Sequence, residues 1–246
     1  MAKAKGSEVG MEVIATAGGT LRRRLAPEAR ARMILEGAIT FFAEHGFQGQ
    51  IRDLAETLGV SQALIFTYFG NKGTLLERVY DEVYLSRWQD AWLDDLRDRS
   101  RPLGERLETF YLSYLDAIDE PIWIRIVLHS GLAGNELTHR YVSRRVEQIL
   151  RAVMAEVRGH FGSALATMDD ADIYERVWDL QASFVYGLIR KHVWLLPVME
   201  DRPRLVAGRV SQFLRGLAAL ASPADVRPSA GPGRRGAKRA ASQAWS

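Results

Sequence analysis

The sequence predicts an all-α protein, and three observations lead to this fold class. Apolar residues recur with helical period in almost every segment between residues 27 and 221. No long segment alternates apolar and polar residues as a half-buried strand does. Glycine, proline and helix-capping residues divide the chain into pieces of helix length.

The composition fits a globular protein and excludes several chemical classes. A chain of 246 residues with 47% hydrophobic residues can bury a real core in one large or two modest domains. The absence of cysteine excludes a disulfide scaffold, a Cys-ligated zinc finger, an iron–sulfur protein and a thiol enzyme. No apolar run approaches the roughly 18 residues of a membrane helix, and no secretory signal pattern begins the chain. We therefore expect a soluble, cytoplasmic protein with no membrane contact.

The positive charge lies at the two ends of the chain. The net charge is +3, of which residues 1–26 carry +3 and residues 222–246 carry +4, so the stretch between them carries −4. Both ends are also rich in Gly, Ala, Pro and Ser, with too little apolar surface to offset ordering entropy. We expect a flexible arm over residues 1–24 and a disordered basic tail over residues 222–246. The basic isoelectric point alone therefore does not argue for DNA binding.

The first predicted helices form a helix-turn-helix pattern. A helix begins at Pro27 and ends at Gly46, which we expect to be a left-handed cap. A short helix from about Ile51, the tight turn Gly59-Val60 and a third helix capped by Ser61 follow. The motif covers about residues 50–69. By pattern alone, such a corner can also be purely structural.

Longer helices are expected in the rest of the chain. Asn71 caps a long fourth helix from Lys72 into the Trp88–Trp92 region. Further helices are predicted over Leu103–Ile118, Ile122–His129, Asn135 or Thr138 to Phe161, Asp169–Leu196, and Pro203–Ala221.

Short motifs follow one another in a fixed order between residues 31 and 80. They are Ile34-Leu35 with Ala38 and Phe42, Glu44-His45-Gly46-Phe47, Asp53-Leu54-Ala55, Gly59-Val60-Ser61, Tyr68-Phe69, and Lys72 with Leu75-Leu76. This set resembles the TetR family of bacterial transcriptional regulators over about 50 of 246 residues. The resemblance implies a DNA-binding domain over residues 25–80, and a helical ligand-binding and dimerisation domain over residues 81–221. It implies no cofactor.

The resemblance also implies which side chains meet DNA. In such a motif the second helix lies in the major groove, and flanking residues hold phosphates. Gln62 can pair with adenine, and apolar groups on the same helix can contact a thymine methyl. Tyr68 and Lys72 match phosphate-contacting positions. The candidate DNA-binding residues are Gln50, Arg52, Ser61, Gln62, Ala63, Leu64, Thr67, Tyr68 and Lys72.

The chain departs from the family pattern at several positions. The segment Gln48-Gly49-Gln50, which joins Gly46-Phe47 to the second helix, is one residue shorter than usual and lacks the Thr or Ser that commonly caps that helix. Leu64, Phe66 and Gly73 also replace commoner residues. These departures leave open which base contacts carry over. Because residues 50–69 are near neutral, Arg22–Arg24 are candidates for an arm that adds positive charge.

Aromatic side chains are dense after the fourth helix, and two interpretations remain open. Through the resemblance they line a pocket for an apolar or aromatic effector; otherwise they are ordinary helix-bundle core. For any single residue the core interpretation is favoured. The candidate ligand-binding residues are Trp88, Trp92, Tyr111, Tyr114, Trp123, His129, Trp178 and Phe184.

The last two helices are apolar over more than one face, which predicts burial against a second surface. The resemblance supplies a homodimer that reads a palindromic operator with half-sites about 34 Å, or a multiple, apart. Burial within one subunit is the alternative. The candidate interface residues are Val177, Leu180, Phe184, Leu188, Val210, Phe213 and Leu217.

The sequence holds little support for catalysis. Glu136 and His139 form half of a di-iron motif, but a second copy is absent from the sequence, so no metal site is predicted. Gly-x-Ser-x-Gly, Walker and Gly-x-Gly-x-x-Gly motifs are also absent. The prediction is a non-enzymatic repressor released from its operator by a small molecule. The alternative is an all-helical enzyme or metal-binding protein with a purely structural helix-turn-helix.

Overall fold

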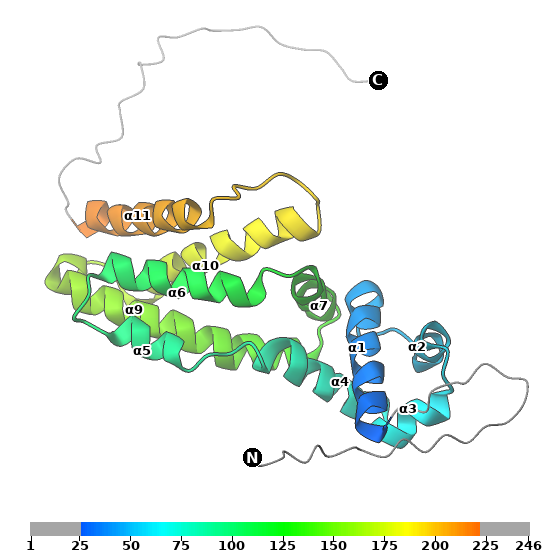
Figure 1. The fold of residues 1–246 in the computed structure, drawn as a ribbon. Coiled ribbons are helices and arrows are strands. Elements are labelled where there is room, and N and C mark those ends of the chain that lie inside the picture. The colour runs from blue at the N-terminus through cyan, green and yellow to red at the C-terminus, as the bar shows by residue number, and fades with distance from the viewer. Residues whose placement is uncertain (1–25, 222–246) are drawn as a thin grey trace, which may run out of the picture.

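The computed structural model describes residues 26–221, and this part of the chain contains helices and no strand, as predicted (Figure 1). The arm over residues 1–24 and the tail over residues 222–246 lie outside the described residues. The α-helices are α1 (Pro27–His45), α2 (Ile51–Leu58), α3 (Gln62–Phe69), α4 (Lys72–Tyr80), α5 (Ala91–Arg97), α6 (Leu103–Ile118), α7 (Pro121–Leu132), α8 (Glu136–Tyr141), α9 (Glu147–Phe161), α10 (Asp170–His192) and α11 (Arg202–Ala221). None of them is long and apolar enough to cross a membrane.

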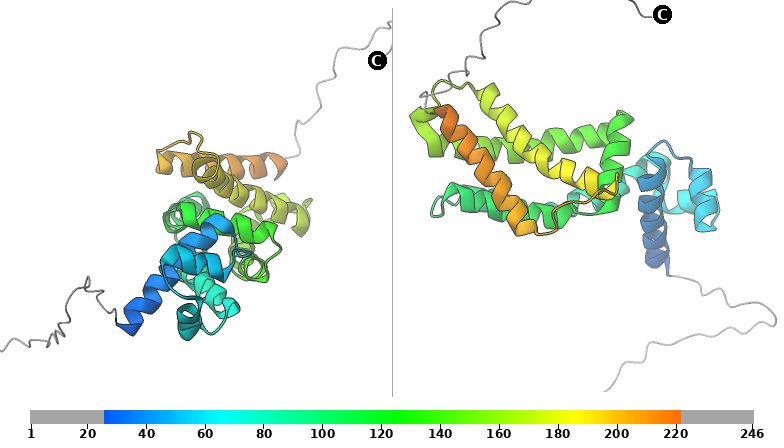
Figure 2. Two further views of the ribbon diagram at one scale, coloured as in Figure 1. Left: turned by 90° about the vertical axis from the view of Figure 1, so that its right-hand side faces the viewer. Right: turned by 90° about the horizontal axis from the view of Figure 1, so that it is seen from above.

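The helices form two groups. Helices α1, α2 and α3 lie together at one end of the molecule, whereas α10 and α11 run along one side of the second group (Figures 1 and 2). Helix α4 leads from the first group to the second, and α7 packs against α1. Helix α11 packs on α6 and α10. A single apolar core runs through both groups, from Ile34 in α1 to Leu217 in α11.

Side-chain caps begin the helices where the sequence predicted them. Ser61, Asn71 and Asp169 each accept a hydrogen bond from the backbone N–H three residues later. Asn135, and not Thr138, opens the helical stretch that ends at Phe161, because its side chain accepts from the Leu137 N–H. These bonds satisfy donors that a helix start leaves free.

The predicted long fourth helix is shorter than expected. Helix α4 continues through the π-helical turn Asp81–Leu85, where the Ser86 N–H donates to the Asp81 carbonyl at 2.9 Å. The chain then turns, and α5 is a separate helix. The Arg87 guanidinium donates to the Val83 carbonyl at 2.9 Å, which satisfies a carbonyl of the last turn and favours the helix end there.

Helix α10 also ends earlier than predicted, at His192 and not at Leu196. Lys191 and His192 at its end both bind the Asp119 carboxylate, with distances of 2.8 Å and 2.6 Å. Leu195 then adopts a positive φ of 54°, which reverses the chain direction. Side-chain pairing outside the helix therefore fixes its end, and the position of Pro197 does not.

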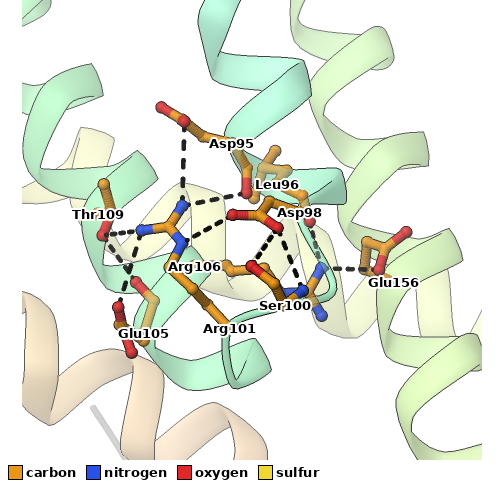
Figure 3. A network of polar contacts seen from close by, with 9 residues as sticks. All are labelled: Asp95, Leu96, Asp98, Ser100, Arg101, Glu105, Arg106, Thr109 and Glu156. Atoms are coloured by element: carbon orange, nitrogen blue, oxygen red, sulfur yellow. Dashed lines mark hydrogen bonds and ion pairs between the residues drawn. The ribbon is translucent and has the colours of Figure 1, made fainter.

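A buried ion cluster holds the corner between α5 and α6 against α9 (Figure 3). The Arg106 and Glu156 side chains are only 5% and 7% exposed, and an Arg106 guanidinium nitrogen lies 2.7 Å from a Glu156 carboxylate oxygen. Arg106 also donates to the Leu96 carbonyl at the end of α5. Arg99 adds two hydrogen bonds to Glu156, at 3.0 Å and 3.1 Å. The network links two consecutive helices, α5 and α6, to α9, which is distant in the sequence.

Candidate nucleic-acid interface

The α2–α3 corner has the geometry of a helix-turn-helix. Gly59 ends α2 in the left-handed conformation, with φ 62° and ψ 35°, which glycine adopts at little cost. The Val60 N–H then donates to the Ala55 carbonyl at 3.0 Å. The Ser61 hydroxyl accepts from the Leu64 N–H at 3.1 Å and starts α3. Local sequence signals therefore set the angle between the two helices.

Helix α3 has one buried anchor and a broad exposed face. Ile65 is fully buried, while Gln62, Ala63, Phe66 and Thr67 are exposed. The exposed residues occupy one face, because residues four apart in a helix lie above one another. Helix α3 also lies at the outer end of the molecule (Figures 1 and 2). This face is therefore free to enter a groove of DNA.

The composition of this face supports some predicted contacts and changes others. The Thr67 hydroxyl donates to the Ala63 carbonyl at 2.8 Å, which leaves its methyl group as the outward-facing surface. Leu64 is half-buried and packs against the core, so it offers less surface to a groove than its exposed neighbours, and its contact with DNA stays a prediction. Phe66, 39% exposed, also lies on the exposed face. Its spacing of four from Gln62 was the sequence signal that could have identified it.

Four other predicted DNA-binding residues lie in α2, in α3 or at the caps before them. Gln50 is exposed and makes no capping hydrogen bond at the start of α2, so its amide is free. The Arg52 side chain is 81% exposed and pairs with Asp53 at 3.4 Å. Ser61 is exposed but already caps α3, and Tyr68 is half-buried beside the core. Capping and core packing therefore constrain Ser61 and Tyr68 more than they constrain Gln50 and Arg52.

Lys72 begins α4 directly after α3. Its ammonium lies 6.0 Å from the centre of the Phe42 ring, and partial burial lowers its pKa. The Asn71 side-chain oxygen Oδ1 accepts from the Thr74 N–H at 2.9 Å, and the two backbone amides before Thr74 have no partner within the helix. A cation and free amides at one helix start favour a phosphate.

The short connection between α1 and α2 depends on Gly49. A Cβ atom at this position would lie 2.5 Å from a carbon of the Phe41 ring, far inside contact distance. Because Gly49 has no side chain, the connection can pass close to the Phe41 ring, although it is one residue shorter than in the family pattern. The departure at Gln48-Gly49-Gln50 is therefore compatible with the observed position of α2.

The described part of this region is nearly neutral. Residues 27–80 contain five basic and six acidic side chains. Binding to phosphates therefore depends on a few placed groups more than on a general positive field. The basic Arg22–Arg24 segment, predicted to form an arm, lies outside the described residues.

Comparisons with known proteins identify the family. A family model described as bacterial regulatory proteins of the tetR family matches residues 34–79. The transcriptional repressor AcnR of Corynebacterium diphtheriae is 30% identical over 168 residues, which cover 61% of this chain and 88% of AcnR. This chain belongs to the TetR family. It is a DNA-binding transcriptional regulator.

Other relatives agree with this assignment. The transcriptional regulator RutR of Escherichia coli K12 is 27% identical over 164 residues, which cover 65% of this chain and 75% of RutR. A solved TetR-like regulator from Rhodococcus sp. RHA1 shares the fold with a TM-score of 0.57, at 16% identity, over 78% of this chain and 100% of that chain.

The structure brings half of the predicted ligand-binding residues of this TetR-family chain into one aromatic cluster. The Tyr111 and Phe184 rings stack with their centres 4.3 Å apart, and the ring centres of Tyr114 and Trp92 lie 5.5 Å apart. Phe110 packs against both Tyr111 and Tyr114. The four predicted members are almost fully buried in the second group of helices. This dense packing also fits the alternative of an ordinary helix-bundle core.

Of the remaining predicted ligand-binding residues, Trp88 lies at the edge of that cluster, and the other three lie apart from it. Trp123 is buried, 6.5 Å from the Tyr141 ring, and Trp88 is half-buried next to Trp92. Trp178 packs against Tyr174. His129 is exposed beside Gly46, at the contact between α7 and α1.

Unpaired polar atoms occur within and beside the aromatic cluster. The Tyr111 hydroxyl, the Trp123 indole nitrogen and the Gln181 carbonyl oxygen are buried without a hydrogen-bond partner among the described residues. Gln181 also donates to the Tyr114 hydroxyl at 3.0 Å, and burial raises the pKa of Tyr114 to about 12. Buried polar groups usually have partners, so each of these three atoms is an exception within the core.

Most of the predicted dimer-interface residues are already buried within the single chain. All except Phe213 are almost fully buried, so a partner would add little to their burial. These buried residues are Val177, Leu180, Phe184, Leu188, Val210 and Leu217. Phe213 is half-buried and borders a groove between α10 and α11, which Leu180 and Leu217 also border. The predicted dimer contact therefore stays a prediction.

Proposed function

We propose that this regulator is a repressor that binds a palindromic operator as a homodimer and is released by a small molecule. Residues 25–80 would bind DNA, and residues 81–221 would dimerise and bind the effector. It has no catalytic role and needs no cofactor in this proposal. It works in the cytoplasm, on the nucleoid, where its operator lies.

One observation carries the DNA-binding part of the proposal. Helix α3 is held by the buried Ile65 and the Ser61 cap, while Gln62, Ala63, Phe66 and Thr67 stay exposed. A rigid helix with a free polar and apolar face can read base edges and thymine methyl groups. Gln50, Arg52, Tyr68 and Lys72 then position the helix on the phosphates.

The second group of helices supports the effector and dimer parts. The aromatic cluster with its unpaired polar atoms is the proposed effector site, and an effector acts by favouring a subunit arrangement that no longer fits the operator. The relative AcnR bears the name of a repressor, which supports repression here. The exposed Tyr186 of α10 and Leu220 of α11 are 51% and 46% exposed, and this outer face is the proposed dimer surface.

Selection of bound duplexes from a random DNA pool at about physiological salt tests this function. We expect an enriched two-fold symmetric sequence with half-sites about one helical turn, ~34 Å, apart. Binding that shows no enrichment and vanishes as salt rises would contradict the proposal. The enzyme or metal-protein alternative would then gain support, although residues 26–221 hold no cluster of three His, Asp or Glu side chains suited to a metal ion.

A further inference from the structure

A cavity of about 620 Å³ lies away from the DNA-binding helices. It is bounded by the end of α6, the second half of α10, the connection between α10 and α11, and the first half of α11. Its volume falls within the range of roughly 300–1,000 Å³ that is typical of small-molecule sites. None of the residues proposed above to contact the effector lines it except Phe184.

The lining of the cavity includes apolar and cationic side chains. Its apolar lining comes from Leu115, Phe184, Leu188, Leu196, Val198 and Leu205. The cations are Arg190, Lys191, Arg202 and Arg209, against the two carboxylates of Asp119 and Glu200. An amphipathic anion matches such a lining, because its tail replaces water on the apolar side chains and its head meets the cations.

Arg190 and Arg209 have no carboxylate partner among the described residues, and of these two only Arg209 has a buried guanidinium nitrogen without any hydrogen-bond partner there. Asp119 binds Lys191 at 2.8 Å and Arg202 at 2.6 Å, while Arg190 donates to the Pro197 carbonyl at 2.7 Å. The Arg209 guanidinium instead lies 5.0 Å from the centre of the Phe184 ring, and its Nη1 is buried without a hydrogen-bond partner in the same part of the chain. Burial, with the nearby charge of Arg190 as a second cause, lowers the pKa of Arg209. An unpaired buried guanidinium N–H is costly, so an acceptor that reaches it is strongly favoured.

We propose that this cavity binds an amphipathic carboxylate, with the carboxylate on Arg209 and the apolar tail against Phe184, Leu188 and Leu205. A monoanion fits better than a phosphate dianion because Asp119 and Glu200 also border the cavity.

The cavity is connected to the rest of the molecule in two ways. Phe184, which lies under Arg209, also stacks on Tyr111 of the aromatic cluster at 4.3 Å. Asp119 lies between α6 and α7, and α7 packs against α1 of the DNA-binding end. An effect of the carboxylate on DNA affinity would rest on the proposed function, whereas its binding in the cavity does not.

Calorimetric titration of the full chain without DNA tests the site with octanoate as the probe. The controls are acetate, which lacks the tail, and 1-octanol, which lacks the charge. We expect octanoate to bind at least tenfold more tightly than either control. Equal binding of octanoate and 1-octanol would overturn the proposal. So would the absence of octanoate binding at 10 mM, a concentration that corresponds to a binding free energy of only ~2.7 kcal/mol.

Paired variants locate the carboxylate. Arg209→Met should weaken octanoate binding at least tenfold, while Arg215→Met, an exposed arginine on the same helix, should leave it unchanged. If Arg209→Met fails to fold, Leu205→Trp serves instead, since it fills space beside the apolar lining of the cavity and should abolish binding. Octanoate binding that both variants retain would place the ligand elsewhere, such as the aromatic cluster, and would overturn the proposal.

Two further outcomes distinguish a ligand site from a subunit contact and from the effector site. If Arg209→Met converts a dimer to a monomer and octanoate binds neither form, Arg209 serves the subunit contact and the proposal is wrong. Arg209-dependent binding of octanoate that leaves affinity for the selected operator unchanged would confirm the site, and would show that it is not the effector site of a repressor.

Discussion

At the scale of single residues, the DNA-binding face depends on how α3 is rotated about its own axis. Ile65 is completely buried and fixes that rotation, so Leu64 packs against the core and Phe66 is exposed. The sequence alone did not distinguish these two apolar neighbours. Their exposure depends on which helices cover α3, and that information is tertiary.

Replacement of Lys72 by glutamine tests its assigned role on phosphate. The variant should bind all DNA sequences more weakly by a similar factor, and the slope of log affinity against log salt should flatten by about 1, because one fewer counterion is released. Anisotropy titrations over a range of salt concentrations measure both effects. Arg215→Gln, at an exposed site on α11, is the matched control. A loss confined to one DNA sequence, or an unchanged salt slope, would contradict the phosphate role.

At the scale of helices, the buried Arg106–Glu156 pair holds α5, α6 and α9 together (Figure 3). Glu156→Gln should lower the free energy of unfolding by about 3 kcal/mol, because it leaves the buried Arg106 guanidinium without a counter-charge. Glu105→Gln should cost less than about 1 kcal/mol, since Glu105 is 56% exposed and 3.8 Å from Arg101. Urea unfolding at neutral pH measures both values. Equal losses would show that the buried pair adds no special stability.

The same pair predicts a pH dependence. Hydrogen bonds from Arg99, and one from Arg106, hold the pKa of Glu156 below its usual value of 4.5. The unfolded chain therefore takes up the proton first as the pH falls. The stabilisation by Glu156 is complete above about pH 4.5 and is lost as the pH falls through the lowered folded pKa. The stability difference between wild type and Glu156→Gln should shrink in acid. A difference that stays constant between pH 7 and pH 3 would contradict this.

Helix boundaries show what the sequence could predict. The start of α1, the bounds of α6 and the Gly59 turn were predicted correctly, because proline, glycine and capping residues act locally. The break before α5 and the early end of α10 were missed. Both depend on side chains that bind partners outside the local pattern, Arg87 to a helix carbonyl and His192 to Asp119.

At the scale of the whole molecule, the sequence predicted an all-helical regulator, but most of the apolar residues that it assigned to the dimer contact are buried within the subunit. The apolar residues of α10 and α11 are mostly core, and the free surface lies on their outer side. Hydrophobic periodicity predicts that a helix face is buried, but it does not identify whether the same subunit or a partner buries that face.

The proposed dimer surface can be tested at an exposed residue. Leu220→Glu should convert a dimer to a monomer at micromolar concentration, because a carboxylate would be buried against the partner. It should also weaken binding to the selected palindrome at least tenfold. Leu132→Glu is the control, since Leu132 is 89% exposed on α7. Sedimentation measures the mass, and a dimer that persists in Leu220→Glu would place the subunit contact elsewhere.

The central claim is that the exposed face of α3 reads the operator bases. The most direct measurement repeats the selection from a random DNA pool with Gln62→Ala, beside wild type. We predict the same palindrome spacing, with the base preference lost at one position in each half-site and a cost there of about 1–3 kcal/mol. An unchanged operator sequence at every position would contradict the assignment of Gln62, and with it the orientation of α3 on DNA.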